Sequence, residues 1–397
     1  MLIEKAPFEF VLKNKVRFGP GIVKELPSIL QEFGFERIGY VIDKNVYEHF
    51  EPLPKLVKDL ENKFQKIVIH LYSQKFEPTY EFLDVVKNEF KQGNQPLVDC
   101  IVGIGGGSSM DTAKVVALLC TNHGPAITYR GFPKNLNNPL PVITIPSTAG
   151  TGSELVYYAS IIDSDTKVKM GVNDPNNYPI LALLDPEVVA IAPKSVAISS
   201  GCDALIHALE SFVSIKSNEV TRIFSKQAFG LIINTLPKLV NDMRNLEHWS
   251  KMQWGAYLAM VGLSNASSGP SGALSYYLGC HFNVPHGIAG AVFIGKITRI
   301  NHELEYYDYS DLYSLLEAHN PLITDKRERS GLVVNAVESF LEVLEIPGNL
   351  SDFGVTKKDY PGFFKYATED AKKAFDFNPV QYSKEVISQL LQNLIFS

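Results

Sequence analysis

One aspartate and two histidines have the spacing expected of a metal site. Asp203 and His207 are four residues apart within a predicted helix, so their side chains share one face, one turn apart. A carboxylate oxygen and an imidazole nitrogen at this spacing can share a divalent ion, although a plain Asp–His hydrogen bond is an alternative. His286, just before another predicted helix, is a third candidate, and His281 lies five residues before it.

A second group of residues is suited to binding a phosphate. Gly105, Gly106 and Gly107 end an apolar run that reads as a buried strand, and Ser108 opens a helical pattern. Glycines let a ligand approach the backbone, and the helix directs N–H groups and the positive end of its dipole at the same point. This pattern predicts a pyrophosphate site, with a tight turn that binds nothing as the alternative.

Hydroxyls and an acidic residue extend this candidate site. Ser147, Thr148 and Thr151 follow another apolar strand and can hydrogen-bond a phosphate, a ribose or an amide. Asp43 ends a strand, where a carboxylate can bind the adenosine ribose hydroxyls and repel a 2′-phosphate, which favours NAD over NADP. A helix N-cap is the other interpretation of Asp43.

The elements that must position these residues alternate in the first half of the chain. Apolar strands separated by helices predict a parallel sheet with helices on both faces. From about residue 193 long helical patterns take over, so we expect an α/β domain at 1–190 and an all-helical domain at 191–397. The expected strands are 15–21, which ends in a turn, and 37–43, 66–71, 98–105, 140–146 and 181–185, with helices at 79–90 and 107–119, a hairpin arm at 161–170, and later helices at 195–214, 219–239, 249–263 and 287–300.

Composition limits the function further. A net charge of −6 and a pI near 5.9 argue against a nucleic-acid partner. No apolar run reaches the ~18 residues of a membrane span, and the first ten residues do not resemble a secretory signal. The four cysteines form no C-x-x-C pair, which is typical of a cytoplasmic protein with reduced thiols.

Taken together, the motifs resemble those of the iron-containing (group III metal-dependent) alcohol dehydrogenase family. The resemblance rests on the glycine turn with Asp111 and Lys114, the run 146–154, the segment 201–210 and the Pro285–Gly287 tripeptide. It implies a Rossmann-like α/β domain and an all-α domain in a dehydroquinate synthase-like architecture. It also implies NAD(P), a divalent Fe²⁺ or Zn²⁺, and a homodimer.

The resemblance assigns roles residue by residue. It places Asp203, His207 and His286 as metal ligands. The cofactor residues that it implies, together with those derived above, are Asp43, Gly105, Gly106, Gly107, Ser108, Asp111, Ser147, Thr148, Thr151 and Lys169.

The chain departs from the family at one ligand. The family has a further metal-ligating histidine fourteen residues before His286, where this chain has Gly272, and Tyr276 replaces another site histidine. Three ligands can still hold a catalytic ion, so a bound metal and an empty site both stay open. Without a metal, Tyr276, His281 or His207 would have to polarise the substrate oxygen as a hydrogen-bond donor.

The expected function is therefore reversible hydride transfer between a nicotinamide and a small primary alcohol or aldehyde, assisted by a metal if one is bound. Tyr276 or His281 would hydrogen-bond the substrate and relay the proton. Two alternatives stay open: an NAD-using lyase or cyclase of the dehydroquinate synthase-like group, and a degenerate member that binds nucleotide without turnover.

Overall fold

The computed structural model describes residues 7–74, 77–134, 136–166 and 168–396. By its internal contacts the chain divides into two units. Residues 13–193 form an α/β unit, and residues 194–397 form a helical unit that also includes the N-terminal arm before residue 13.

The arm belongs to the helical unit because its contacts lie there, whereas the sequence placed it with the α/β domain. The backbone N–H of Val11 donates to Asn265 Oδ1 at 2.7 Å, and Asn265 Nδ2 donates to the carbonyl of Val11 at 3.0 Å. The ring of Phe10 stacks on Phe224, with centroids 5.7 Å apart. Asn265 and Phe224 lie far from the arm in the sequence, so no local pattern predicts that they contact it.

The α/β unit is built on a six-stranded parallel sheet in the order β1-β8-β7-β6-β2-β3. A parallel sheet with buried central strands confirms the expected α/β class, and the expected β2 has the observed bounds. The strands are β1 (Lys15–Phe18), β2 (Arg37–Asp43), β3 (Lys66–Tyr72), β6 (Cys100–Gly105), β7 (Val142–Pro146) and β8 (Leu181–Leu184), with a separate hairpin of β4 (Lys91–Gln92) and β5 (Gln95–Pro96).

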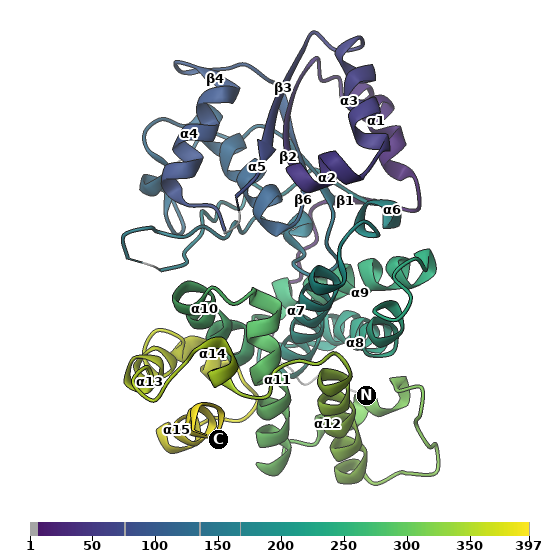
Figure 1. The fold of residues 1–397 in the computed structure, drawn as a ribbon, viewed down its shortest axis with the longest axis vertical. Helices are drawn as coiled ribbons and strands as arrows, with labels where there is room; N and C mark the ends of the chain where they lie inside the picture. Colours follow the sequence, from purple (N-terminus) through teal and green to yellow (C-terminus); the bar gives the residue numbers. More distant parts are fainter. Residues whose placement is uncertain (1–6, 75–76, 135, 167, 397) are drawn as a thin grey trace. The chain divides into compact units, whose positions relative to one another are not determined.

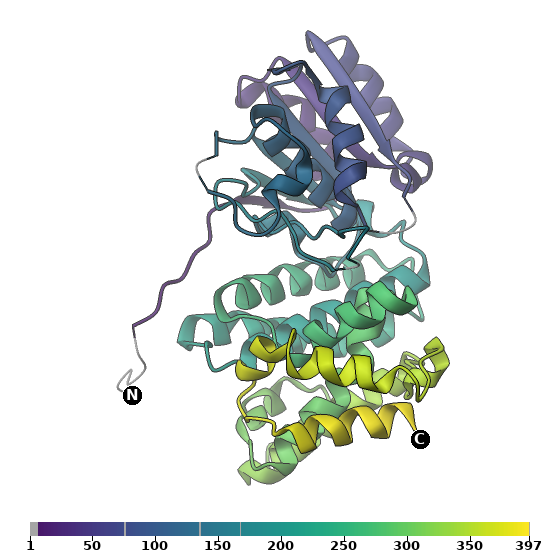
Figure 2. The same ribbon diagram turned by 90° about the vertical axis from the view of Figure 1, so that its left-hand side faces the viewer.

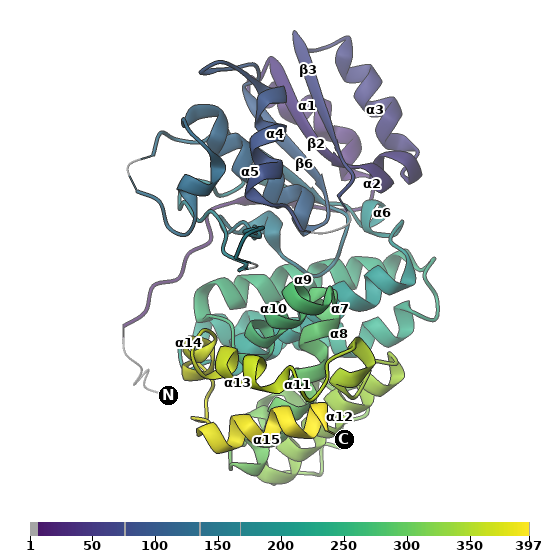
Figure 3. The same ribbon diagram turned by 60° about the vertical axis from the view of Figure 1, so that its left-hand side comes forward.

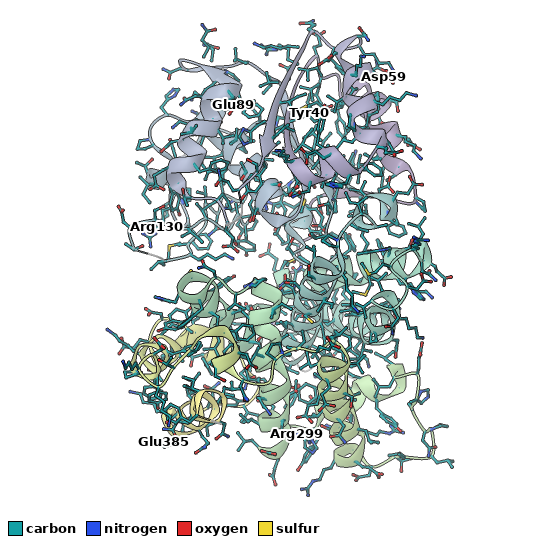
Figure 4. All side chains as sticks on the ribbon, viewed as in Figure 1. Tyr40, Asp59, Glu89, Arg130, Arg299 and Glu385 are labelled. Atoms are coloured by element: carbon teal, nitrogen blue, oxygen red, sulfur yellow. The ribbon has the colours of Figure 1, made fainter. Side chains whose placement is uncertain are left out.

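Helices cover both faces of this sheet (Figure 1). Alternate residues of β2 enter different cores: Tyr40 packs with the side of α1 and α3, and Val41 packs with the side of α4 and α5. Figure 4 shows Tyr40 among the strands, where it is fully buried. The helices of this unit are η1 (Ile22–Glu25), α1 (Leu26–Glu32), α2 (Lys44–His49), α3 (Pro52–Glu61), α4 (Tyr80–Phe90), α5 (Gly107–Thr121), η2 (Ala126–Tyr129), η3 (Ser153–Leu155) and α6 (Pro186–Val189).

The helix expected at 79–90 does not bury both of its adjacent valines. Val85 is 66% exposed, whereas Val86 is buried, because adjacent helical residues point about 100° apart. The hairpin arm expected at 161–170 is present in the described residues as antiparallel pairing. Ile162 bridges to Lys169, the N–H of Met170 donates to the carbonyl of Ile161 at 3.0 Å, and the N–H of Asp163 donates to the carbonyl of Val168 at 3.1 Å.

The helical unit contains the elements that carry the metal-site candidates. Helix α7 carries Asp203 and His207, α10 carries Gly272 and Tyr276, and α11 begins at His286. The turned views show α13 and α15 running side by side (Figures 2 and 3). The helices are α7 (Lys194–Val213), α8 (Glu219–Leu239), α9 (Leu246–Ala266), α10 (Pro270–Phe282), α11 (His286–Glu303), η4 (Asp308–Leu315), α12 (Lys326–Val343), η5 (Leu350–Phe353), α13 (Tyr360–Thr368), α14 (Lys372–Asp376) and α15 (Lys384–Ile395).

No helix was expected at 270–282, since a glycine such as Gly279 is typical of a turn. Gly279 instead lies inside α10, which ends at Phe282, and the C-cap Asn283 has the left-handed conformation, with φ 56°. Asparagine tolerates that conformation and is a common helix C-cap.

Helix α7 is also long and apolar enough, by length and composition, to cross a membrane. The helix is not an uninterrupted apolar run, because Asp203, His207 and Glu210 lie within it, so the sequence expectation about apolar runs is not contradicted. The segment is 83% buried inside the protein, as the core helices of water-soluble proteins also are, so the match is weak evidence.

Candidate functional site

The glycine turn joins β6 directly to α5 with almost no space for side chains. Gly105 has φ 149°, and a Cβ there would come within 2.7 Å of Ser109 Oγ and 2.8 Å of Asp43 Cβ. Helix α5 begins at Gly107 without a side-chain cap on its first N–H groups. The end of a fifteen-residue helix therefore offers uncapped donors and a positive dipole, which suit a phosphate.

Hydroxyls surround this helix end. Ser109 Oγ and Thr148 Oγ1 are both buried and have no hydrogen-bond partner among the described residues. A Cβ on Gly106 would lie 3.5 Å from the Thr148 methyl, and one on Gly107 would lie 3.1 Å from the Thr151 methyl. Buried hydroxyls without partners are costly, so a ligand with acceptor oxygens fits this place. Ser109 was not singled out from the sequence, although its position in the first turn of α5 could have suggested it.

The loop after β7 lies against the glycine turn, as expected. The N–H of Ser147 donates to the carbonyl of Gly105 at 2.9 Å, and Ser147 is buried. The structure thus brings together the two segments, 105–109 and 147–151, that the sequence selected separately.

Asp43 serves as a helix cap at the end of β2. Its Oδ1 accepts hydrogen bonds from the N–H groups of Asn45 at 2.8 Å and Val46 at 3.4 Å, at the start of α2. Its Cβ also borders the glycine turn. We call the glycine turn at 105–107, the start of α5 and the hydroxyls of Ser109 and Thr148 the phosphate cradle. Both interpretations of Asp43 are compatible, since capping through Oδ1 still places a carboxylate beside this cradle.

Tyr72, at the end of β3, is a neighbour of the cradle that the sequence did not reveal. Burial raises the pKa of its phenol, and a hydrogen bond with the Ser108 side chain opposes that effect. Ser108 is thus held from the side of β3, and the adjacent strand ends β2, β3 and β6 all contribute to this region.

Lys169 and Asp111 are both engaged with other side chains. Lys169 Nζ is 2.6 Å from Glu77 Oε1. Asp111 accepts hydrogen bonds from Ser153 Oγ at 2.5 Å and the N–H of Ser160 at 2.8 Å, and Lys114 Nζ lies 2.9 Å from its Oδ1. Asp111 is therefore placed to hold the loop that follows Thr151.

Lys114 completes this internal support. Its fully buried ammonium donates to the carbonyls of Ser153 at 3.0 Å, Val156 at 3.1 Å and Tyr158. A buried cation needs such compensation, and here one ion pair and three carbonyls supply it. The hydroxyl-bearing loop is thus attached to α5 itself.

The candidate metal residues approach one oxygen atom. His207 Nε2 is 3.3 Å and His286 Nε2 is 3.7 Å from Asp203 Oδ1. Two ligands at ~2.05 Å from a tetrahedral ion would stand about 3.3 Å apart, so these separations are close to what an ion requires. The oxygen and imidazole donors suit a divalent transition-metal ion. Among the described residues, no group of three or more His, Cys, Asp or Glu side chains is placed so that it could hold a metal ion, so the three candidates would have to move closer together to bind one.

The fourth ligand of the family is absent here, and its place is tight. A Cβ on Gly272 would come within 2.6 Å of Ser268 Oγ and 3.2 Å of Glu210 Oε2. A histidine at this position would therefore require Ser268 to move.

Tyr276 and His281 are placed differently. The ring of Tyr276 stacks on His286, with centroids 4.9 Å apart and planes at 19°. His281 is exposed, and its ring lies 4.3 Å from that of Tyr277. Hydrogen bonds from Thr356 lower the pKa of Asp359, and His281 adds a smaller effect of the same sign. These contacts associate Tyr276 with the metal candidates and His281 with the start of α13.

Glu210 links the two helices that carry most of this site. From α7, it accepts hydrogen bonds at the start of α10 from the N–H groups of Gly269 at 2.7 Å, Ser271 at 2.6 Å and Gly272 at 3.2 Å, and from Ser268 Oγ at 2.9 Å. Burial raises the pKa of Glu210, and these donors oppose that effect. A carboxylate here satisfies the helix N–H groups and complements the dipole.

Two family models match this chain. Iron-containing alcohol dehydrogenase matches residues 13–186, and the C-terminal model of the Fe-containing alcohol dehydrogenase family matches residues 197–395. The chain belongs to the iron-containing alcohol dehydrogenase family. This confirms the resemblance drawn from the motifs, the enzyme class and the dehydroquinate synthase-like fold. Members of this family use NAD and a divalent metal.

Similar proteins span almost the whole chain. The NAD-dependent methanol dehydrogenase of Bacillus methanolicus is 32% identical over 383 residues, covering 95% of this chain and 97% of that protein. Alcohol dehydrogenase 4 of Schizosaccharomyces pombe is 29% identical, covering 95% and 86%. A crystal structure of 1,3-propanediol oxidoreductase matches with a TM-score of 0.90 at 25% identity, covering 98% of this chain and 100% of that one. These relatives favour the oxidoreductase over the lyase.

Glu154 gives a pH-dependent prediction for the α/β unit. Its buried carboxyl has Oε2 without a partner among the described residues, and burial raises its pKa from 4.5 to about 7. Between these values the folded chain holds a proton that the unfolded chain releases. The free energy of unfolding should therefore fall as pH rises from about 4.5 to about 7, by up to ~1.4 kcal/mol per pH unit. Denaturant titrations of Glu154→Gln should show a flatter profile, and a profile parallel to that of the unmodified protein would contradict this.

Glu210 gives a prediction for the helical unit. Glu210→Gln turns an amide NH₂ toward backbone N–H donors, so we expect the free energy of unfolding to drop by about 2 kcal/mol in denaturant titrations. The matched control is Glu247→Gln, whose side chain is 74% exposed in the first turn of α9 and which should change stability by less than ~0.5 kcal/mol. Equal effects of the two changes would contradict the role given to Glu210.

Proposed function

We propose that this protein catalyses reversible hydride transfer between NAD and a small primary alcohol or its aldehyde. The observation that carries the proposal is the convergence of two imidazole nitrogens on Asp203 Oδ1, within 3.7 Å, in a chain that also has a phosphate cradle. The methanol and propanediol dehydrogenases named among its relatives support small primary alcohols as the substrate class.

The α/β unit binds the dinucleotide in this proposal. The N–H groups at the start of α5 and the hydroxyls of Ser109 and Thr148 bind the pyrophosphate, with Gly106 and Gly107 allowing close approach. Asp43 faces the adenosine ribose and disfavours the 2′-phosphate of NADP by charge repulsion. When bound, NAD supplies the nicotinamide carbon that accepts or donates the hydride.

Three residues of the helical unit hold the metal in this proposal. Asp203 gives a carboxylate oxygen, and His207 and His286 give Nε2 atoms. When bound, the ion supplies a Lewis acid that stabilises negative charge on the substrate oxygen. Either Fe²⁺ or Zn²⁺ suits this mixed oxygen and nitrogen set.

Tyr276 is the proposed proton-handling residue. It replaces a site histidine of the family, and its ring packs against His286. A phenol hydroxyl can both donate to and accept from a substrate oxygen, so it can move a proton to or from the alcohol. His281, exposed and packed on Tyr277, takes no part in this proposal.

The first test measures turnover. Purified protein freed of metal is mixed with NADH and a panel of short aldehydes, with and without added Zn²⁺ or Fe²⁺, and the absorbance of the reduced cofactor is followed. We expect metal-dependent loss of that absorbance, and about a hundredfold lower kcat/KM for His286→Ala. His319→Ala, at an exposed site in the same unit, should leave the rate unchanged. No oxidation of NADH with any aldehyde and either metal would contradict the proposal.

The second test isolates the phosphate cradle. Thr148→Val removes a buried hydroxyl while keeping the shape of the side chain, so NAD binding measured by calorimetry should weaken about tenfold. Thr121→Val, in the last turn of α5, is the matched control, because its hydroxyl is satisfied by the carbonyl of Leu118 at 3.1 Å. If both variants bind NAD as the unmodified protein does, Thr148 does not contact the cofactor.

A further inference from the structure

The hydroxyl of Ser275 connects a backbone carbonyl with the imidazole of His286. Ser275 Oγ is 2.6 Å from the carbonyl oxygen of Gly272 and 2.7 Å from His286 Nδ1. Ser275 is fully buried on α10, and His286 begins α11. A serine hydroxyl has one hydrogen, so these two short contacts decide each other's direction.

The carbonyl determines where that hydrogen lies. A carbonyl oxygen only accepts hydrogen bonds, so the contact at 2.6 Å is favourable when Ser275 donates to Gly272. The Ser275 oxygen must then accept from His286, which places the imidazole hydrogen on Nδ1. The opposite arrangement would leave two oxygen atoms with lone pairs facing each other at 2.6 Å.

The tautomer of His286 follows from this chain of bonds. With the hydrogen on Nδ1, the neutral imidazole presents a lone pair at Nε2, the atom 3.7 Å from Asp203 Oδ1. A nitrogen lone pair and a carboxylate oxygen directed at one region are an arrangement that a cation stabilises. Hydrogen bonding at the other ring nitrogen is also the usual way in which proteins orient a metal-ligating histidine and raise its basicity.

The neighbouring residue limits rotation of the same ring. Tyr276 stacks on His286 with an interplanar angle of 19°, so the imidazole is held by a hydrogen bond at its edge and by a ring on its face. By contrast, Nδ1 of His207 is buried and has no hydrogen-bond partner in the described part of the chain. His286 thus has an outer support that is not seen at His207.

We infer that Ser275 is a positioning residue that holds His286 in the Nδ1–H tautomer and so makes Nε2 the atom that ligates the metal. This inference rests on the proposed metal-assisted function. It assigns a role in metal affinity to a side chain that touches neither the cofactor nor the reacting atoms.

The test compares zinc affinity among matched variants, measured by calorimetry or by competition with a chromophoric chelator. Ser275→Ala should weaken zinc binding by about 10- to 100-fold, and Ser275→Thr, which keeps the hydroxyl, should recover most of the loss. Ser271→Ala is the control: it lies one turn earlier on α10, is equally buried, and has a hydroxyl without a partner among the described residues. Its zinc affinity should match that of the unmodified protein.

The zinc titrations distinguish failure of the role given to Ser275 from failure of the metal site itself. If Ser275→Ala binds zinc as tightly as the unmodified protein while His286→Ala does not bind it, the role of Ser275 is overturned and the metal site stands. If the unmodified protein binds no more zinc than His286→Ala does, the proposed metal site fails, and this inference fails with it.

A measurement on the unmodified protein tests the tautomer directly. Nitrogen-15 NMR of the metal-free protein, with the His286 signal assigned by its loss in His286→Gln, should show the imidazole hydrogen on Nδ1. A hydrogen on Nε2 would overturn the inference.

Discussion

The helical unit depends on the buried carboxylate of Glu210. It lies on the same helix as Asp203 and His207, and its four hydrogen bonds hold the first turn of α10. Helix α10 in turn carries Ser275 and Tyr276, which both contact the His286 ring. The positions of the three metal candidates therefore depend on one charged group whose desolvation is offset by helix donors.

In the α/β unit a buried positive charge has the role that the carboxylate of Glu210 has in the helical unit. There the buried ammonium of Lys114 lies beside Asp111 and holds three carbonyls of the segment 153–158. That segment continues the loop whose hydroxyls surround the start of α5. In both units, a buried charge satisfied by backbone groups positions the atoms that the proposed chemistry needs.

Much of the fold could be predicted because its signals are local. Apolar runs that end in glycine or in a capping residue predicted β2, β6 and the start of α5. The helical pattern at 219–239 predicted α8 with its observed bounds. Helix α10 was missed because its start is capped by Glu210, some sixty residues earlier in the chain, and because Gly279 inside it suggested a turn. A cap contributed by a distant helix leaves no local pattern.

The site was predicted less completely, for similar reasons. Residue types and spacing selected Asp203, His207 and His286, whose approach to one oxygen the structure then supplied. Ser109 and Ser275 were not predicted as site residues, because the role of a serine depends on neighbours that only the tertiary structure shows. The ion pair of Lys169 with Glu77 likewise required the tertiary fold.

The most direct measurement follows the hydrogen itself. An aldehyde is reduced by the metal-loaded protein with NADH that carries deuterium at the transferable position of nicotinamide C4, and the alcohol is analysed by mass spectrometry. We expect one deuterium on the carbinol carbon of the product. Alcohol without deuterium, or recovery of the labelled NADH with no alcohol formed, would contradict hydride transfer as the function of this protein.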